Sequence, residues 1–455
     1  MEPDTFCKST PTSCADAPAA PAPSGIEAGN VPHTVATAER PKLVVVYHPH
    51  SISPFEIAES ARDLCDLIWV LDRTDPQLKA LVALIRRLGT TINTAGLSDG
   101  DVAARVAAEH PDGVITFLEQ LPLAAAIAQA CDLRFHSPFT ADLLTNKYRQ
   151  RLALAEAGLP GPGFWPVPHD TDASVRADLV SQLRFPVVLK PQDGSGSQNT
   201  CQVDDSDALG RLLDDAQGRG EDMLVEEVLA EARPRDAQRF SELLMVDSFV
   251  SGGRVSHYVV AGHFIPAPPF RGTGSFIPSD LDDADTKAVL EATEAAIAAL
   301  HVEEGFTDTD VIMTPDGPRV LEVNGRIGGQ IPTLVQMAGA PALLPEAMRV
   351  ALRLSDGDIA AFPTDQVPFC AMYQSPMEAQ CLVELTGLDV VAQLPGVTRI
   401  VADRRAGDVI DWRTGTLSRL FTTYGVADDH DHLYHLYQQI QTSVVARYEM
   451  AAREP

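Results

Sequence analysis

Short apolar runs alternate with helix-length segments near the start of the chain, and this alternation constrains the fold more than any other feature. The expected strands lie at 42–47, 66–72, 90–93 and 113–117, and the expected helices at 54–65, 76–89, 99–109 and 121–131. Such alternation is typical of βαβ units, because two parallel strands need a long crossover connection between them. We therefore expect an N-terminal α/β domain with a parallel sheet over residues 41–140.

Charge and cysteine usage exclude several classes of protein. The chain has 455 residues with 63 Asp and Glu against 35 Lys and Arg, a formal net charge of −28. A surface this acidic repels phosphate backbones and anionic lipid. We therefore expect neither a nucleic-acid partner nor a membrane partner. The seven cysteines form no CxxC pair, and no apolar run is long enough to span a bilayer. The sequence therefore predicts a cytoplasmic protein.

The remaining segments differ from the N-terminal pattern in composition and periodicity. Residues 1–40 are rich in Pro and Ala and are expected to form a disordered tail. A Pro/Gly hinge at 157–168 precedes two apolar hairpins, which are expected to turn at 251–253 and 315–317. We expect a second domain at 141–355, with a mobile lid at about 166–240, and a C-terminal α+β module at 356–455.

A glycine-containing loop, DGSGSQNT at 193–200, follows an apolar strand that ends at Lys190. Its glycines and small hydroxyl residues let backbone N–H groups approach phosphate oxygens, and the lysine would add a positive charge. The loop lacks the Gly-Lys-Ser/Thr of a Walker A motif. An ordinary turn and a surface lysine are the alternative interpretations at this point.

The hairpin at 308–326 carries acidic residues inside apolar strands. Asp310 and Glu322 would face each other across the turn, and Asn324 would add a third oxygen ligand, a set that suits Mg²⁺. A solvated strand face is the alternative. Arg326 follows on the same side and could hold a phosphate or a carboxylate, and Gly328 with Gly329 opens a segment with free N–H groups.

The order of these motifs resembles the ATP-grasp ligases. It runs from NK at 146–147 through FPVVLKP, the glycine loop, LVEEVL and a distal acid to LEVNGRIGG, and the resemblance covers about 42–355. Within that family the chain is most similar to the amino-acid ligases, which make dipeptides or related amides. The resemblance implies an ATP-grasp fold: a parallel pre-ATP-grasp domain, a mobile lid, a large antiparallel subdomain and a C-terminal module.

The resemblance also implies roles for individual residues. Lys147, Lys190 and the glycine-loop residues Gly194, Ser195, Gly196 and Ser197 would contact ATP phosphates, and Glu226, Glu227 and Val228 would contact the adenine edge. Glu242 is the expected ribose carboxylate, although EARPRDAQRF at 231–240 looks like an insertion. Asp310, Glu322 and Asn324 would hold two Mg²⁺ ions, with Mn²⁺ as a substitute. Arg326 and Lys190 are the expected catalytic residues, and Arg326, Gly328, Gly329 and Ser275 the expected substrate residues.

The sequence departs from the family pattern at three positions. Asp310 stands where Glu is usual, Asp308 where many relatives carry His, and Ser275 where some amino-acid ligases place a His. These departures affect the metal geometry and the substrate more than ATP binding.

The function predicted from the sequence is ATP-dependent joining of a carboxylate to an amine, giving an amide, ADP and phosphate. The substrates would be small molecules, with an amino acid as the acid and a second one as the amine. Two alternatives are an ATP-grasp enzyme of the purine-pathway or carboxylase type that activates another small acid, and a regulatory ATP-binding protein without turnover. The assembly state is left open, with a homodimer among the options.

Overall fold

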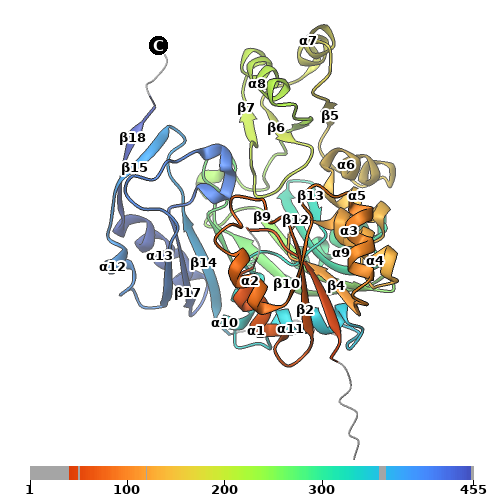
Figure 1. Cartoon of the computed structure of the whole chain (residues 1–455). Coiled ribbons are helices and arrows are strands. Elements are labelled where there is room, and N and C mark those ends of the chain that lie inside the picture. The colour runs from red at the N-terminus through yellow and green to blue at the C-terminus, as the bar shows by residue number, and fades with distance from the viewer. Residues whose placement is uncertain (1–39, 50–51, 119, 358–364, 452–455) are drawn as a thin grey trace, which may run out of the picture. The chain divides into compact units, whose positions relative to one another are not determined.

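Four parallel strands form the first sheet in a computed structural model that describes residues 40–49, 52–118, 120–357 and 365–451. The strands are β1 (Lys42–Val46), β2 (Asp66–Leu71), β3 (Thr90–Asn93) and β4 (Gly113–Thr116), in the order β3-β2-β1-β4. The helices between them are α1 (Pro54–Ala61), α2 (Val82–Leu88) and α3 (Asp99–Ala107), and α4 (Leu121–Cys131) follows β4 (Figure 1). The parallel α/β pattern expected from the sequence is confirmed. The expected tail lies outside the described residues except for Arg40.

One helix of this layer is shorter than predicted. The sequence predicts a helix over 76–89, but α2 begins only at Val82. The preceding residues form tight turns in which Leu78 N donates to Asp75 O and Leu81 N to Leu78 O. These hydrogen bonds join residues three positions apart, whereas those of an α-helix join residues four positions apart. Only the last turns of the apolar pattern are therefore α-helical.

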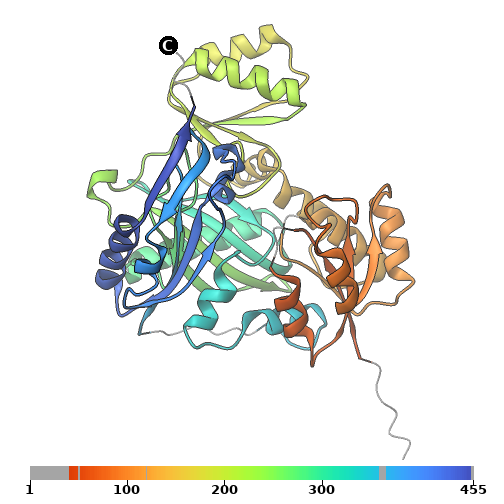
Figure 2. The same ribbon diagram turned by 60° about the vertical axis from the view of Figure 1, so that its left-hand side comes forward.

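A small antiparallel sheet with two helices forms the segment that we predicted to be a lid. Helices α5 (Pro138–Thr145) and α6 (Lys147–Glu156) lead into it, and Asn146 caps α6 by accepting from Arg149 N. Its strands are β5 (Phe164–Val167), β6 (Val187–Pro191), β7 (Cys201–Val203) and β8 (Met223–Glu227), and its helices are α7 (Ala173–Gln182) and α8 (Ser206–Arg219). The helices cover one face of this sheet (Figure 2), where Leu209 and Leu213 pack against Val187.

The largest sheet has eight strands and contains both predicted hairpins. Its order is β13-β12-β9-β10-β11-β14-β17-β16. These strands are β9 (Leu243–Ser251), β10 (Arg254–His263), β11 (Gly274–Phe276), β12 (Glu304–Thr314), β13 (Gly317–Asn324), β14 (Val367–Tyr373), β16 (Val397–Ala402) and β17 (Phe421–Ala427). The β9–β10 turn has positive φ at Gly252 and Gly253 (55° and 75°), as a two-residue type I′ hairpin requires. Helix α9 (Asp283–Ala299) buries Val289, Thr293 and Ile297, which recur at helical spacing on one face.

The C-terminal residues continue this sheet and add a smaller layer. Because β14, β16 and β17 pair within the eight-stranded sheet, it runs through the boundary predicted at 355, and the domain division stays a prediction. The other elements are the 3₁₀ segments η1 (Arg235–Ala237) and η2 (Trp412–Ser418), helices α10 (Ile331–Met337), α11 (Leu343–Ala351), α12 (Leu388–Val391) and α13 (His430–Ser443), and strands β15 (Ala379–Thr386) and β18 (Val445–Met450).

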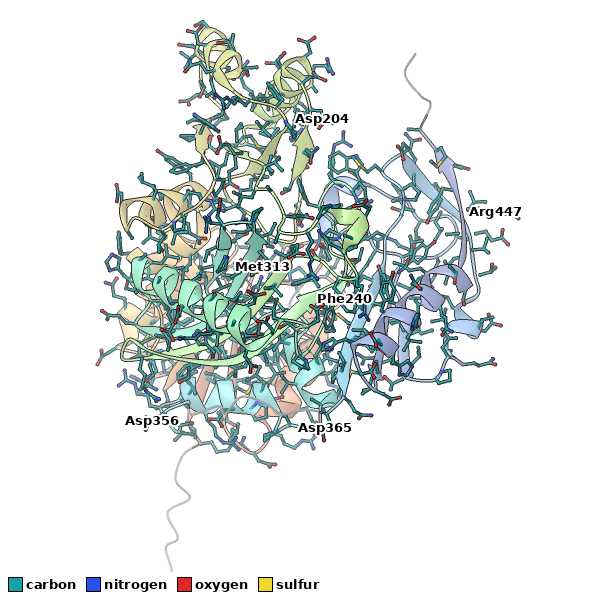
Figure 3. All side chains as sticks on the ribbon, turned by 180° about the vertical axis from the view of Figure 1, so that it is seen from behind. Asp204, Phe240, Met313, Asp356, Asp365 and Arg447 are labelled. Carbon is teal, nitrogen blue, oxygen red and sulfur yellow. The ribbon has the colours of Figure 1, made fainter. Side chains whose placement is uncertain are left out.

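Phe240, labelled in Figure 3, belongs to an apolar cluster shared by the sheet and α13. The cluster also contains Phe276, Phe369 and Leu433. Contact between large apolar side chains from both parts stabilises the C-terminal layer against the sheet. In the part of the chain that the structure describes, no helix is long and apolar enough to cross a membrane.

Candidate active site

A cavity of about 860 Å³ lies where the lid, the strands β12 and β13 and the loop around 266–270 meet. Most residues that the sequence predicted to bind ATP or metal line it. These residues are Lys147, Lys190, Gly194, Ser195, Gly196, Ser197, Glu226, Glu227, Val228, Asp310 and Glu322. The fold thus brings together segments that are more than 170 positions apart in the chain.

Buried charges connect the lid sheet to helix α6. The Glu226 carboxylate lies 2.8 Å from Lys190 Nζ and 2.7 Å from Arg151 Nε, and all three side chains are largely buried. Burial lowers the pKa of Lys190, against the opposing charge of Glu226. Burial alone would raise the pKa of Glu226, but the charges of Lys190 and Arg151 lower it to about 2. Glu226 therefore stays ionised and holds two cations in place.

Helix α6 also fixes the edge strand β13. Gln150 accepts from Val323 N at 2.8 Å and donates to Val323 O at 2.9 Å, while Arg151 Nη1 donates to Val320 O at 2.8 Å. Because β13 is the last strand of the sheet, its outer backbone groups would otherwise lack partners. These contacts set the position of Glu322, which lies between the two bonded residues.

Lys147 joins the glycine loop to β13. Its Nζ lies 2.7 Å from Glu322 Oε1 and donates to Gly194 O at 2.5 Å. Burial alone would raise the pKa of Glu322, but the charges of Lys147 and Lys190 lower it. A lysine in this place can contact phosphate and acidic ligands of the same cavity.

The two acids predicted to bind metal face each other across the hairpin. Asp310 pairs directly with Glu322 in the strand register, and Asp308 pairs with Asn324. Burial raises the pKa of Asp310 well above its ordinary value, and the neighbouring charges of Asp308 and Glu322 raise it further. Asp308 is buried, and Asp310 and Glu322 line the cavity, so the hairpin does not present these acids on an open solvated face.

A divalent cation suits this donor set. Two carboxylates crowded on a cavity wall repel each other, and a cation between them would relieve that repulsion. Asn324 does not line the cavity, and its Nδ2 donates to Asp308 O at 3.3 Å, so Oδ1 is its candidate ligand atom. Among the described residues, no group of three or more His, Cys, Asp or Glu side chains is arranged to hold a metal. The candidate set therefore depends on an amide, on water and on phosphate oxygens.

Arg326 lies beside this cavity and is not on its wall. Its guanidinium is paired with Asp308, and both side chains are largely buried. Arg326 instead lines a small pocket of about 30 Å³. Arg134 and Thr116, the last residue of β4, line the same pocket. The predicted substrate arginine thus lies between the large sheet and the parallel sheet.

The backbone N–H of Gly328, which the sequence predicts to be free, donates a hydrogen bond within the protein. Gly328 N donates to Asp247 Oδ1 at 2.7 Å, and Tyr258 donates to the same oxygen at 3.1 Å. The sequence could not predict this contact, because Asp247 lies on a distant strand. Gly329 does not line the main cavity, and its role stays a prediction.

Two other predicted residues lie off the cavity wall. The Glu242 carboxylate is 3% exposed and accepts from Arg233, which itself lines the cavity. Ser275 is buried in β11 with its Oγ 3.6 Å from Cys370 Sγ. Their predicted ribose and substrate roles stay predictions.

Sequence reasoning missed several wall residues in the segment that looked like an insertion. Glu231, Arg233 and Arg235 line the cavity, as do Phe270 and Met377. The two arginines within ten residues of the predicted adenine segment were the available signal, because basic residues near a nucleotide site can face phosphate. Nothing local pointed to Met377, which follows β14.

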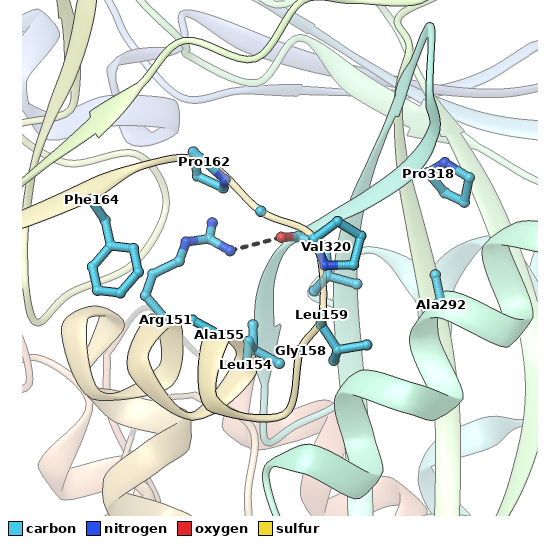
Figure 4. Close-up of a pocket in the computed structure, with 12 residues that line it drawn as sticks. Arg151, Leu154, Ala155, Gly158, Leu159, Pro162, Phe164, Ala292, Pro318 and Val320 are labelled. Carbon is cyan, nitrogen blue, oxygen red and sulfur yellow. Dashed lines mark hydrogen bonds between the residues drawn. The ribbon is translucent and has the colours of Figure 1, made fainter.

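A second cavity, of about 330 Å³, lies beside Arg151 (Figure 4). Apolar side chains from α6 and the Pro/Gly hinge line it, including Leu154, Leu159 and Phe164. Arg151 reaches across it to Val320 O. This cavity therefore contacts the buried ion network but contains none of the predicted site residues.

Both the sequence and the fold of this chain are similar to those of known proteins. Residues 144–330 match the ATP-grasp domain family. An uncharacterised protein of Sinorhizobium fredii is 27% identical over 60% of this chain and 52% of its own length. The L-arginine-specific L-amino acid ligase of Bacillus subtilis is 22% identical over 65% of this chain and 70% of its own length. The match thus spans about half the length of the Sinorhizobium fredii protein.

The structure of an L-amino acid ligase from Bacillus licheniformis has the same fold. The two superpose with a TM-score of 0.69 over 91% of this chain and 100% of that one, at 19% sequence identity. At this identity the likeness concerns the fold alone. The chain thus carries an ATP-grasp domain match at residues 144–330 and has the same fold as this ligase.

Proposed function

We propose that the protein is an ATP-dependent ligase that joins the carboxylate of one small molecule, an amino acid, to the amine of a second. One observation carries the proposal: Asp310 and Glu322 face each other on the wall of the cavity that Lys147, Lys190 and the glycine loop also line. The acidic side chains could bind a metal cation, and the lysines could bind the phosphates of ATP. Both kinds of group in one cavity suit phosphoryl transfer. The ATP-grasp domain and the likeness to amino-acid ligases support it.

The residues around the cavity would hold ATP in distinct ways. Glu226, Glu227 and Val228 lie at the end of β8 and would contact the adenine edge. Lys147 and Lys190 would face the phosphates, and the glycine loop would add backbone N–H donors. Asp310, Glu322 and Asn324 would hold Mg²⁺. Bound Mg²⁺ would supply the positive charge that neutralises the phosphate oxygens during transfer.

A carboxylate resists attack by an amine, because it is anionic and has no good leaving group. In the proposed reaction a carboxylate oxygen bonds to the γ-phosphorus while the bond from that phosphorus to the β-bridging oxygen breaks, which gives an acyl phosphate and ADP. The amine nitrogen then bonds to the acyl carbon, the carbon–oxygen bond to phosphate breaks, and the amine loses a proton. Positioning and charge compensation by the cavity residues account for the catalysis.

Water must be excluded, because the acyl phosphate hydrolyses readily. The glycine loop belongs to the lid and lies on the cavity wall, where it can cover the phosphates. Arg326 lies next to the acidic hairpin and would hold the carboxylate of the acid substrate. Asp308 would orient the guanidinium, since the two are paired already.

The proposal is tested by measuring phosphate release from Mg-ATP across a panel of single and paired amino acids, with mass spectrometry of the products. We expect phosphate only with particular pairs, together with a product whose mass equals the pair minus water. Release that needs bicarbonate or another small acid would instead support the purine-pathway or carboxylase type. ATP binding without release from any mixture would contradict the ligase and favour a regulatory protein.

A further inference from the structure

The glycine loop has a backbone conformation that needs support from outside the loop. Gly194 and Gly196 have φ of 121° and 62°, and the non-glycine residues Ser197 and Asn199 have φ of 59° and 48°. Left-handed conformations of non-glycine residues are strained and persist only where the surroundings hold them. The backbone hydrogen bonds within the loop are long, since Gln198 N donates to Ser195 O and Thr200 N to Ser197 O, both at 3.3 Å.

The segment η2 of the C-terminal module supplies this support directly. Thr416 N donates to Gly196 O at 2.9 Å, and Asn199 N donates to Arg413 O at 3.0 Å. Two backbone hydrogen bonds thus join the loop to residues more than 210 positions later in the chain. Gly415 also lies close to the backbone of the loop, next to Gly196 and Ser197.

Only glycine fits at position 415. Its φ and ψ are 64° and −136°, a combination that is essentially restricted to glycine. A Cβ added there would lie 2.1 Å from Gly196 O and 2.7 Å from Ser197 C, and both are backbone atoms that cannot rotate away. The absence of a side chain is therefore what allows the two backbones to approach.

The other side of η2 is anchored to the loop that precedes β11 and to the residue that follows β14. The buried Arg271 donates to Ser418 Oγ at 3.1 Å, Gly272 N donates to Thr416 Oγ1 at 3.0 Å, and Gln374 Nε2 donates to Thr416 O at 3.2 Å. Trp412 packs against the apolar core of the lid. The segment is thus held firmly on one side and contacts the lid on the other.

We propose that Trp412–Ser418 is a positioning element for the phosphate-binding loop: it holds the loop, in its left-handed conformation, on the wall of the cavity. The role in nucleotide binding rests on the proposed function, whereas the contact itself does not. A loop that is already ordered loses less conformational entropy when a ligand binds, so the docked loop binds nucleotide more tightly than a free one. No residue of the segment lines the cavity itself.

The test compares Gly415→Ala with Gly407→Ala in the full-length protein. Gly407 also has positive φ, 93°, but a Cβ there would meet nothing within 4 Å, so this control carries the backbone penalty without the clash. Amide hydrogen exchange is measured at Thr416 and Asn199, the two donors of the contact. Loss of the contact in Gly415→Ala should speed exchange there about tenfold or more relative to Gly407→Ala. The dissociation constant for a non-hydrolysable ATP analogue with Mg²⁺ should rise by about tenfold as well.

The outcomes separate this proposal from the proposed function. Equal exchange and equal affinity in the two variants would overturn the positioning role, even if the protein proved to be a ligase. A wild-type protein that binds no nucleotide would refute the proposed function, while the exchange result would still decide the contact. Trp412→Ala, which removes apolar contact to the lid without backbone strain, provides a second variant. If Gly415→Ala fails to fold, Trp412→Ala must show the faster exchange at an unchanged melting temperature, or the proposal is wrong.

Discussion

Replacement of Glu322 by glutamine is expected to reduce turnover by at least about 10³-fold, the scale observed when one group that neutralises transferring phosphoryl charge is removed. Glutamine keeps the shape of the side chain but lacks its charge. The cavity would then hold Asp310 as its only acid on this hairpin wall, and Lys147 would lose its anionic partner. Cation binding and the placement of Lys147 should fail together.

The measurement is the initial rate of phosphate release with the active substrate pair, at saturating Mg-ATP. Asp316→Asn is the matched control, because Asp316 is exposed in the turn of the same hairpin and does not line the cavity. This control should keep the wild-type rate. Retention of more than a tenth of the activity in Glu322→Gln, with the melting temperature unchanged, would show that Glu322 does not hold the cation.

Glu226→Gln is expected to lower the free energy of unfolding by about 3–5 kcal/mol, which is the cost of removing one member of a buried ion network. Glu226 is the only anion in contact with both Lys190 and Arg151 among the described ion pairs. Its loss leaves two buried cations facing a neutral amide. The measurement is urea-induced unfolding of the variant and the wild type under the same conditions.

Two further variants make this prediction specific. Glu227→Gln removes an exposed neighbouring charge, and its stability should stay within about 0.5 kcal/mol of the wild type. Arg151→Met and Glu226→Gln should together be less harmful than the sum of the single variants, by about 0.5–3 kcal/mol, because both act on one network. Strict additivity would indicate that the pair makes no net interaction.

The sequence predicts the parts of this fold whose signals are local. Both hairpins turn where glycine pairs or Pro-Asp-Gly interrupt apolar strands, and α9 buries the residues that its 3.6-residue period selects. The helix at 76–89 is longer in the prediction than in the structure, since apolar spacing does not separate a helical turn from successive tight turns. Strand order in the eight-stranded sheet has no local signal, because it depends on packing between distant segments.

The candidate site follows the same division. Asp310 and Glu322 were predictable because one tight turn brings them opposite each other. The contact of Asp247 with Gly328 N–H and the ion pair of Arg233 with Glu242 were not, since each joins residues whose separation in space depends on the folded chain. The docking of the glycine loop on Gly415 spans more than 210 positions and depends on the absence of a side chain, which a single sequence does not reveal.

If ATP activates the carboxylate by phosphorylation, one oxygen atom of the acid must pass to the released phosphate, and isotopic labelling detects this transfer. The acid substrate is labelled with ¹⁸O in both carboxylate oxygens and incubated with Mg-ATP, the amine and the enzyme in unlabelled water. Each released phosphate should carry one ¹⁸O atom, and each amide should retain the other. Phosphate without ¹⁸O, or the appearance of AMP and pyrophosphate in place of ADP, would contradict activation by phosphorylation.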